Sequence, residues 1–153
     1  MSKPIDNHAV SSINDCRIVD LPRHRHPNGS LSVVENGNAD FDIKRVYYIY
    51  DVPGDSERGG HSHRLMQSFI IAASGSFDVT VSDGHETRRF SLNRPYKALY
   101  LPAGIWRSLD NFSSGAVCLS LASDLYDESD YVRDYEEFKQ LTACKRHDFE
   151  AKP

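Results

Sequence analysis

Hydrophobic and polar residues alternate with a period of two along most of the chain between residues 16 and 122. Side chains two apart on a β-strand share a face, so this alternation indicates strands with one face turned toward a core. Turn-forming pairs such as Asp83-Gly84 interrupt the pattern about every eight to twelve residues. Many short strands of this kind predict an all-β sandwich or barrel. The predicted strands are residues 16–21, 30–35, 43–51, 67–73, 77–82, 86–92, 98–102, 106–111 and 116–122, with a further strand around 61–63.

A helical pattern replaces this alternation near the C-terminus. From Tyr131 to Leu141 apolar residues recur at helical spacing, behind an acidic first turn that suits the positive end of a helix dipole. This predicts one C-terminal α-helix over about residues 127–141. At the other end, residues 1–14 show no period, so we expect a loose N-terminal tail. With 153 residues in all, the chain is predicted to form a single domain, 1–153.

The segment 22–29 is polar and rich in turn-forming residues, including Pro22, Pro27 and an Asn-Gly pair. It contains His24 and His26, whose two-residue spacing has no fixed geometric meaning in a loop. We therefore expect a solvated basic loop, with the edge of a phosphate site as the alternative.

Composition narrows the classes of protein that fit this pattern. A formal net charge of −4, with 39% hydrophobic and 10% aromatic residues, suits a globular protein and gives no field that attracts nucleic acid. No apolar run is long enough for a signal peptide or a membrane span. Cys16, Cys118 and Cys144 lack metal-site spacing and fit reduced thiols. We expect a cytoplasmic protein that acts on neither nucleic acid nor membrane.

Residues 58–67 concentrate the candidate chemistry. They place His61 and His63 two residues apart, after a double glycine and before the apolar run 69–73. On a strand both imidazoles project from the same face. Such a pair suits either a metal site or acid–base chemistry, and the spacing alone leaves both open.

The predicted strand 43–51 carries a second polar face. Arg45 and Tyr47 share one side of it, and an arginine that points inward needs an anionic partner. Tyr47 is as compatible with packing inside a barrel as with catalysis.

Two motifs of the chain resemble those of the cupins. The first is the glycine-led pair His61 and His63, with Gln67 in the position of the family's glutamate, and the second spans residues 102–111, with Arg107 in the position of a histidine. The resemblance implies a cupin fold, that is, a double-stranded β-helix or jelly-roll barrel. A metal site like the family's would use three histidines and one glutamate. Gln67 lacks the charge and Arg107 is a permanent cation that cannot ligate, which argues for proton transfer without metal.

A closer resemblance extends over nearly the whole length. Residues 43–49, 58–63, 99–102 and 122–131 look like one group of metal-free cupins, the TDP-4-keto-6-deoxyglucose 3,4-ketoisomerases, including WxcM-like modules fused to sugar acyltransferases. The resemblance implies a homodimer, a TDP-linked keto-deoxysugar as substrate, no cofactor, and a role in deoxyamino-sugar biosynthesis for O-antigen or another surface polysaccharide. It leaves open whether carbon 4 of the product is galacto or gluco.

The chemistry of such a reaction fits the residues independently. Moving a ketone from carbon 4 to carbon 3 requires a base for the carbon 3 proton, a proton shuttle and stabilisation of an enediolate. It needs no redox cofactor, and the sequence has no glycine-rich nucleotide fingerprint. We expect His61 to be the base and His63 its partner, with the reverse order left open, and Tyr47 to pass protons to an oxygen.

Other residues are predicted to bind the substrate. We expect Arg45, Arg58 or Arg107 to neutralise the diphosphate, and we include Gln67 and Tyr100 as substrate-binding candidates. For Arg107 the alternative is a hydrogen bond to the backbone.

Three other functions share these features. A sugar-nucleotide 3,5-epimerase needs the same base beside an adjacent carbon. A non-catalytic sugar-nucleotide-binding cupin module would bind without exchanging protons. A metal-dependent cupin dioxygenase would need a bound metal.

Overall fold

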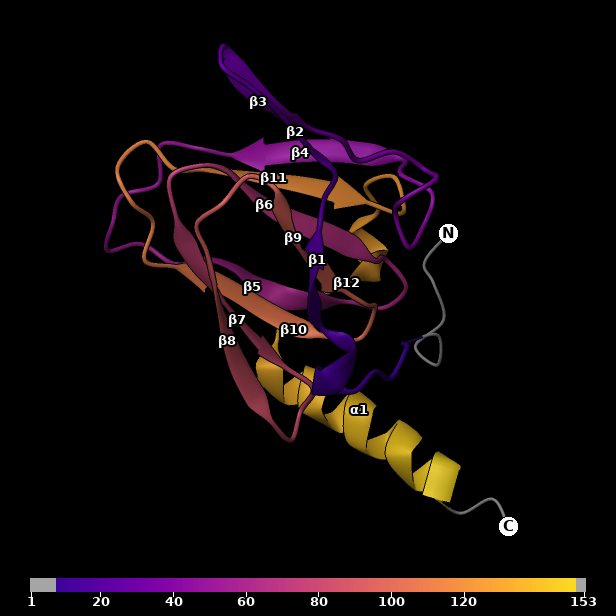
Figure 1. Cartoon of the computed structure of the whole chain (residues 1–153). Coiled ribbons are helices and arrows are strands. Elements are labelled where there is room, and N and C mark those ends of the chain that lie inside the picture. The colour runs from indigo at the N-terminus through magenta and orange to yellow at the C-terminus, as the bar shows by residue number, and fades with distance from the viewer. Residues whose placement is uncertain (1–7, 151–153) are drawn as a thin grey trace.

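A computed structural model describes residues 8–150 of the chain, and their side chains as far as residue 143. Two five-stranded antiparallel sheets lie face to face, and a separate two-stranded hairpin projects from one of them (Figure 1). The first sheet has the order β1-β9-β6-β11-β4 and the second the order β12-β5-β10-β7-β8. This arrangement confirms the predicted all-β jelly roll with a C-terminal helix. The strands are β1 (Arg17–Asp20), β2 (Arg23–His26), β3 (Gly29–Ser32), β4 (Arg45–Ile49), β5 (Arg58–His63), β6 (Ser68–Ser74), β7 (Phe77–Ser82), β8 (Thr87–Leu92), β9 (Lys97–Leu101), β10 (Trp106–Asp110), β11 (Val117–Ala122) and β12 (Tyr131–Val132).

Strand β6 shows how the sequence builds this core. Ile70 and Ala72 belong to the cluster between the two sheets, whereas Phe69 and Ile71 pack on the other face of the strand. That outer cluster includes Phe41, whose ring meets the Phe69 ring edge to face at 5.3 Å. A strand buried on both faces reads as a continuous apolar run instead of an alternating one.

The cysteines contribute to the core as thiols. Cys16 and Cys118 are buried and form no disulfide. Burial raises the pKa of Cys16 to about 11 and that of Cys118 to about 12, so neither is a reactive thiolate at neutral pH. The side chain of Cys144 lies outside the described residues.

The predicted loop 22–29 is wrong in geometry, although its exposure is as expected. Strands β2 and β3 pair in a hairpin whose register joins His26 to Gly29, and every residue of both strands is exposed. The turn-forming residues Pro27 and Asn28 mark the tip of this hairpin. Strand β3 overlaps the predicted strand 30–35, but β2 consists of basic residues and carries no hydrophobic alternation that would reveal it.

The expectation of a loose tail over residues 1–14 is wrong for its described part, residues 8–14; residues 1–7 lie outside the described residues. The backbone N–H of Ala9 donates to the Arg64 carbonyl at 2.9 Å, and the Ser11 hydroxyl donates to the Ala103 carbonyl at 2.7 Å. The Ile13 N–H then donates to the Asp83 carboxylate at 2.9 Å, and a short 3-10 helix, η2 (Ile13–Asp15), follows. These long-range partners, rather than a local pattern, order the segment.

The predicted start of the C-terminal helix is also wrong. Residues 127–132 form the 3-10 helix η3 (Glu128–Asp130) and strand β12, and the helix α1 runs over Tyr135–Glu150. Asp134 begins it, since its side chain accepts the Glu137 N–H at 2.9 Å as an N-cap does. Helix α1 lies beneath the second sheet (Figure 1), with Phe138 fully buried against Trp106. No helix within residues 8–150 has the length and apolar character that crossing a bilayer demands.

Candidate active site

Strand β5 brings the two predicted histidines to the inner face of the second sheet. Its pairing with β10 sets Arg107 opposite His61 and then slips by one residue, with Gly59 at a φ of 87°. Only glycine adopts that conformation without strain, and such a bulge re-aims the side chains beside it. His61 is half-buried, whereas His63 is fully buried behind it.

The two imidazoles form a chain of hydrogen bonds that ends on a carboxylate. His61 Nε2 lies 3.1 Å from His63 Nε2, and His63 Nδ1 lies 3.2 Å from Asp130 Oδ2. The rings of the two histidines meet edge to face, with centroids 4.7 Å apart. Sequence reasoning missed Asp130 as a site residue, although it lies in the stretch 122–131 that carries the family likeness.

Burial sets the protonation of this pair. It lowers the pKa of His61 to about 2, with a further contribution from the Arg107 charge. Burial also lowers the pKa of His63, to about 4, against the opposing effect of its hydrogen bond to Asp130. Both imidazoles are therefore neutral at neutral pH, the form that a proton-accepting base requires.

Arg107 is a buried cation that no ion pair among residues 8–143 includes. Only 2% of the residue is exposed, and burial lowers its pKa, yet guanidinium remains charged in proteins. Its Nη1 donates to the Ser68 hydroxyl at 3.4 Å and its Nη2 to the Ile105 carbonyl at 3.2 Å, while its Nε has no partner. The predicted alternative, a backbone hydrogen bond, is thus present, but it leaves the charge without an anion.

A cavity of about 570 Å³ opens beside these groups, with walls from both sheets. His61 and Arg107 line one side, and Tyr47 and Ser120, which pair across β4 and β11, line the other. Arg58, which the sequence predicted as a substrate-binding residue, lies on strand β5 with His61 and also lines the cavity. Three further lining residues were not among the predicted site residues: Leu109, Tyr131 and Arg133.

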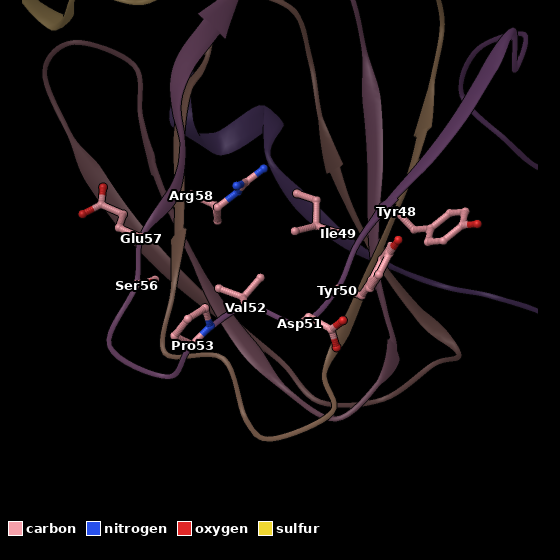
Figure 2. A pocket seen from close by; sticks show the side chains of 9 residues that line it. All are labelled: Tyr48, Ile49, Tyr50, Asp51, Val52, Pro53, Ser56, Glu57 and Arg58. Atoms are coloured by element: carbon pink, nitrogen blue, oxygen red, sulfur yellow. The ribbon is translucent and has the colours of Figure 1, made fainter.

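A second hollow of about 420 Å³ adjoins the cavity and shares Tyr48, Ile49, Glu57 and Arg58 with it. Figure 2 shows Arg58 and Glu57 on one side of this hollow and Tyr48 and Tyr50 on the other. An exposed cation where two connected spaces meet, with aromatic rings beyond it, suits an extended ligand that has an anionic middle.

Two of the predicted substrate-binding residues lie elsewhere. The Tyr100 hydroxyl donates to Gln67 Oε1 at 2.7 Å, and the Tyr100 ring stacks on Phe41 in the outer cluster. Neither residue lines the cavity. The chain bends between β5 and β6, so the residue that turns inward is Ser68, one position after Gln67.

Arg45 and Tyr47 share the inner side of β4, as their spacing predicts. The guanidinium carbon of Arg45 lies 5.0 Å from the centroid of the Tyr47 ring and 5.6 Å from that of Tyr126. Tyr47 lines the cavity and Arg45 does not.

The metal site that a cupin likeness suggests does not fit these residues. Gln67, in the position of the family's glutamate, bonds Tyr100 and does not line the cavity, and Arg107, in the position of a histidine, carries a charge that opposes a second cation. Among the described side chains, no three of His, Cys, Asp or Glu come together in a group that is able to hold a metal ion.

The chain is similar to known proteins along most of its length. It matches the family model described as "FdtA: WxcM-like, C-terminal" over residues 14–143. It is 38% identical over 128 residues to a TDP-4-oxo-6-deoxy-alpha-D-glucose-3,4-oxoisomerase of Aneurinibacillus thermoaerophilus, which covers 83% of this chain and 92% of that protein.

Solved structures of 3,4-ketoisomerases are also similar to the chain. The WlaRB TDP-quinovose 3,4-ketoisomerase of Campylobacter jejuni is 43% identical and superposes with a TM-score of 0.80, covering 84% of this chain and 99% of its own. A histidine-to-asparagine mutant of the 3,4-ketoisomerase QdtA of Thermoanaerobacterium thermosaccharolyticum, in complex with TDP-4-keto-6-deoxyglucose, is 32% identical. Its TM-score is 0.85, over 88% of this chain and 98% of that one.

Proposed function

The chain belongs to the FdtA family of WxcM-like, C-terminal proteins, and from this premise we propose that it is a TDP-4-keto-6-deoxyglucose 3,4-ketoisomerase working by histidine acid–base catalysis. Its relatives are 3,4-ketoisomerases of TDP-linked sugars, and one of them is complexed with this substrate. One observation carries the catalytic part: a neutral His61, bonded to His63, lines a cavity beside an unpaired buried cation.

The reaction needs only proton transfers. His61 takes the proton from carbon 3, and the C–H electrons form the double bond to carbon 4 while the carbonyl pair moves onto its oxygen. The imidazolium then returns a proton to carbon 4, and the hydroxyl proton on the carbon 3 oxygen passes to the carbon 4 oxygen. The ketone ends on carbon 3 with no electrons gained or lost. Positioned transfers of this kind contribute roughly 10²–10⁴-fold in rate.

The order of the two histidines follows from their exposure. His61 lines the cavity, whereas His63 is 0% exposed and reaches it only through His61. We therefore assign the first base to His61 and a supporting role to His63. Tyr47, on the opposite wall, is the proposed carrier of the oxygen-to-oxygen proton.

We propose a separate role for each of the three predicted arginines. Arg107 lies deep, opposite His61, so we assign it to the enediolate oxygens instead of the diphosphate. Arg58, exposed where the two hollows meet, is the proposed diphosphate contact. Arg45 packs over the Tyr47 ring and is proposed to orient it. Gln67 and Tyr100 bond each other outside the cavity and receive no contact with substrate.

Replacing His61 with asparagine tests the base assignment. We expect H61N to lose ketone migration while TDP still binds, because the amide keeps a polar group in place of half of the ring but cannot accept a proton at neutral pH. Incubation with TDP-4-keto-6-deoxyglucose in deuterium oxide, followed by NMR of the product, is the assay. Turnover at the wild-type rate in H61N would remove His61 from the reaction.

The same assay separates the rival functions. A 3,5-epimerase exchanges the proton on carbon 5, which ketone migration leaves in place. A non-catalytic module binds the sugar nucleotide without bringing deuterium into it. The configuration of carbon 4 in the product also follows from the coupling constants.

We also propose a homodimer, and the edge strand β4 supports it. Val46 and Tyr48 on its outward face, and Tyr50 just after its end, are 54%, 61% and 59% exposed, an apolar row along the free edge of the described sheet. A second copy can cover such a row by two-fold symmetric pairing. Light scattering should give twice the monomer mass for the wild type, the monomer mass for V46E and the dimer mass for the control L125E. A monomeric wild type contradicts the proposal.

We place the enzyme in the cytoplasm, in the synthesis of deoxyamino sugars for O-antigen or another surface polysaccharide. The free thiols of Cys16 and Cys118 support a reducing compartment. Fractionation of cells that produce the protein tests the location, and recovery in the periplasm would contradict it.

A further inference from the structure

The turn before β12 docks a carboxylate behind the histidine pair. Asp130 is 3% exposed, and its Oδ1 accepts the Leu65 N–H at 2.9 Å. Its Oδ2 lies 3.3 Å from the Met66 nitrogen and 3.2 Å from His63 Nδ1. The Asp130 carbonyl also accepts the Arg64 N–H at 2.8 Å, which fixes the turn to the end of β5. Two backbone donors thus hold the carboxylate in place beside the imidazole.

These contacts decide which nitrogens of the two imidazoles carry protons. An ionised carboxylate only accepts, so His63 Nδ1 must donate to Asp130. A neutral His63 then has its lone pair on Nε2, where it accepts the Nε2–H of His61 at 3.1 Å. His61 in turn is left with its lone pair on Nδ1, a nitrogen with no hydrogen bond to any described residue. The Asp130 carboxylate therefore determines, through His63, which nitrogen of His61 is the basic atom.

We propose that Asp130 is a positioning residue for the isomerisation, which holds His63 in the Nδ1–H tautomer and thereby leaves His61 Nδ1 as the base. This rests on the proposed function. When His61 Nδ1 takes the carbon 3 proton, the Nε2 proton of His61 moves to His63 Nε2. The positive charge then lies on His63, next to the Asp130 carboxylate, which stays unprotonated throughout. The steps run in reverse when carbon 4 receives its proton.

The charges around His63 make this carboxylate necessary. Arg45 on β4 and Arg107 on β10 both act on His63 as positive charges, and the Tyr131 ring from β12 covers it with centroids 4.4 Å apart. The neighbouring imidazole is also positive once it has accepted a proton. Asp130 is the one acidic group among these neighbours in the described part of the chain, so it alone offsets a cation that forms on His63.

Asp130→Asn is the direct test, because it keeps the shape and removes the charge. Its amide nitrogen can donate to His63 Nδ1, which moves the His63 proton to Nε2 and leaves the His61 proton on Nδ1, the atom proposed as the base. We expect kcat to fall by roughly 10²–10⁴-fold, the range that a positioned proton transfer contributes, with KM within about threefold of the wild type. Asp127→Asn, which perturbs the N-cap of the same turn, is the matched control and should keep most of kcat.

Two measurements separate positioning from a merely structural role. Two-bond ¹H–¹⁵N spectra of the ligand-free wild type should show His63 protonated on Nδ1, and those of D130N should show it protonated on Nε2. Second, D130N should not slow an H63N enzyme further, because the carboxylate then has no imidazole to act through.

The outcomes are distinct. An Nε2–H tautomer of His63 in the wild type overturns the proposal whether or not the variant folds. Wild-type kcat in D130N, or an equal loss in the H63N background, overturns it as well. If the wild type shows no isomerase activity with any TDP-linked ketosugar, the proposed function fails, while the tautomer spectra still test the role of Asp130.

Discussion

Replacing Arg107 with methionine should make the protein more stable and much less active. The guanidinium is 2% exposed, has no carboxylate partner within residues 8–143, and leaves its Nε without any acceptor. Its two hydrogen bonds, to Ser68 and Ile105, are long at 3.4 Å and 3.2 Å. Methionine reaches about as far as the arginine Nε, replaces the aliphatic part of the side chain, and has no charge to keep out of water.

The expected gain follows from these contacts. An unmet buried donor costs about 1–3 kcal/mol, and removing an ion from water costs several kcal/mol more. The two long hydrogen bonds of Arg107 offset part of this cost. Each stabilises the fold by about 0.5–1.5 kcal/mol at the strength of an ordinary hydrogen bond, and by up to about 3 kcal/mol at the strength of a charge-assisted one. We therefore expect R107M to raise the free energy of unfolding by about 1–3 kcal/mol. For a chain of this size that corresponds to a Tm increase of roughly 2–4 °C per kcal/mol.

Activity should change in the opposite direction. If Arg107 stabilises the enediolate, its loss lowers kcat by roughly 10²–10³-fold, as the loss of one preorganised oxyanion donor does. The assay pairs calorimetric unfolding with product NMR on the same preparation. The control is R89M, which removes an exposed guanidinium paired with Asp78 and Asp110 and should leave kcat unchanged and Tm equal or lower. A Tm for R107M several degrees below that of the wild type would show that Arg107 holds the fold together and refute the reasoning.

Three further predictions concern protonation, the proton shuttle and the docked N-terminal segment. Burial lowers the pKa of His63 from 6.5 to about 4, so the unfolded chain binds more protons between these values. Stability should therefore fall as pH drops through this window, with His63 contributing at most about 1.4 kcal/mol per unit and His61 adding to the fall. Urea unfolding at pH 7, 5.5 and 4.5 measures this fall, which should be smaller in H63N, and an equal fall in both proteins contradicts it. Tyr47→Phe should lower kcat by roughly 10²-fold while Tm moves by no more than about 2 °C, since only a cavity-facing hydroxyl is lost. An unchanged kcat would show that Tyr47 only packs in the barrel. Gly104→Ala should destabilise the protein by more than about 1 kcal/mol, because Gly104 has a φ of 80° and a Cβ there would overlap the Ala9 carbonyl oxygen. Hydrogen exchange of the Ala9 N–H should then accelerate. Slow exchange of this N–H in a destabilised variant would show that the substitution does not act by displacing the N-terminal segment.

The strands were predictable because their signals are local. An alternating pattern such as 77–82, followed by Asp83-Gly84, specifies a hairpin within a few residues, and the structure has β7 and β8 pairing there. Strand β2 and its pairing with β3 were missed for the opposite reason. Both strands are exposed on both faces, and β2 has no apolar residue that would distinguish it from a loop.

The errors near the C-terminus have a tertiary cause. The spacing from Tyr131 onward satisfies a helix as far as local rules go, but Tyr131 pairs with His63 as part of β12. The Asp130 carboxylate bonds residues 63, 65 and 66. A single sequence does not show that a carboxylate belongs to a histidine more than sixty positions earlier. The offset between Gln67 and Ser68 has the same origin, since it depends on a bend that the packing of β6 imposes.

Arg107 forms no ion pair with Glu57, the one carboxylate among the described residues that line the cavity, so in the proposed reaction the substrate supplies its counter-charge. Arg107 is a cation without an anion, and the histidine beside it stays neutral because burial and that same cation lower its pKa. The enediolate is the species that meets this imbalance, because its oxygen gains charge only after carbon 3 loses its proton. An interaction that strengthens only in the transition state raises kcat without tightening the ground state. Asp130 offsets the positive charge of the same step. The proton that leaves carbon 3 puts this charge on imidazoles that already face two arginines. In the proposed reaction each of the two charges created by one proton transfer has a fixed counter-charge, Arg107 for the enediolate oxygen and Asp130 for the imidazoles. These counter-charges would let a barrel whose motif positions hold Gln67 and Arg107 move a proton from carbon without a metal.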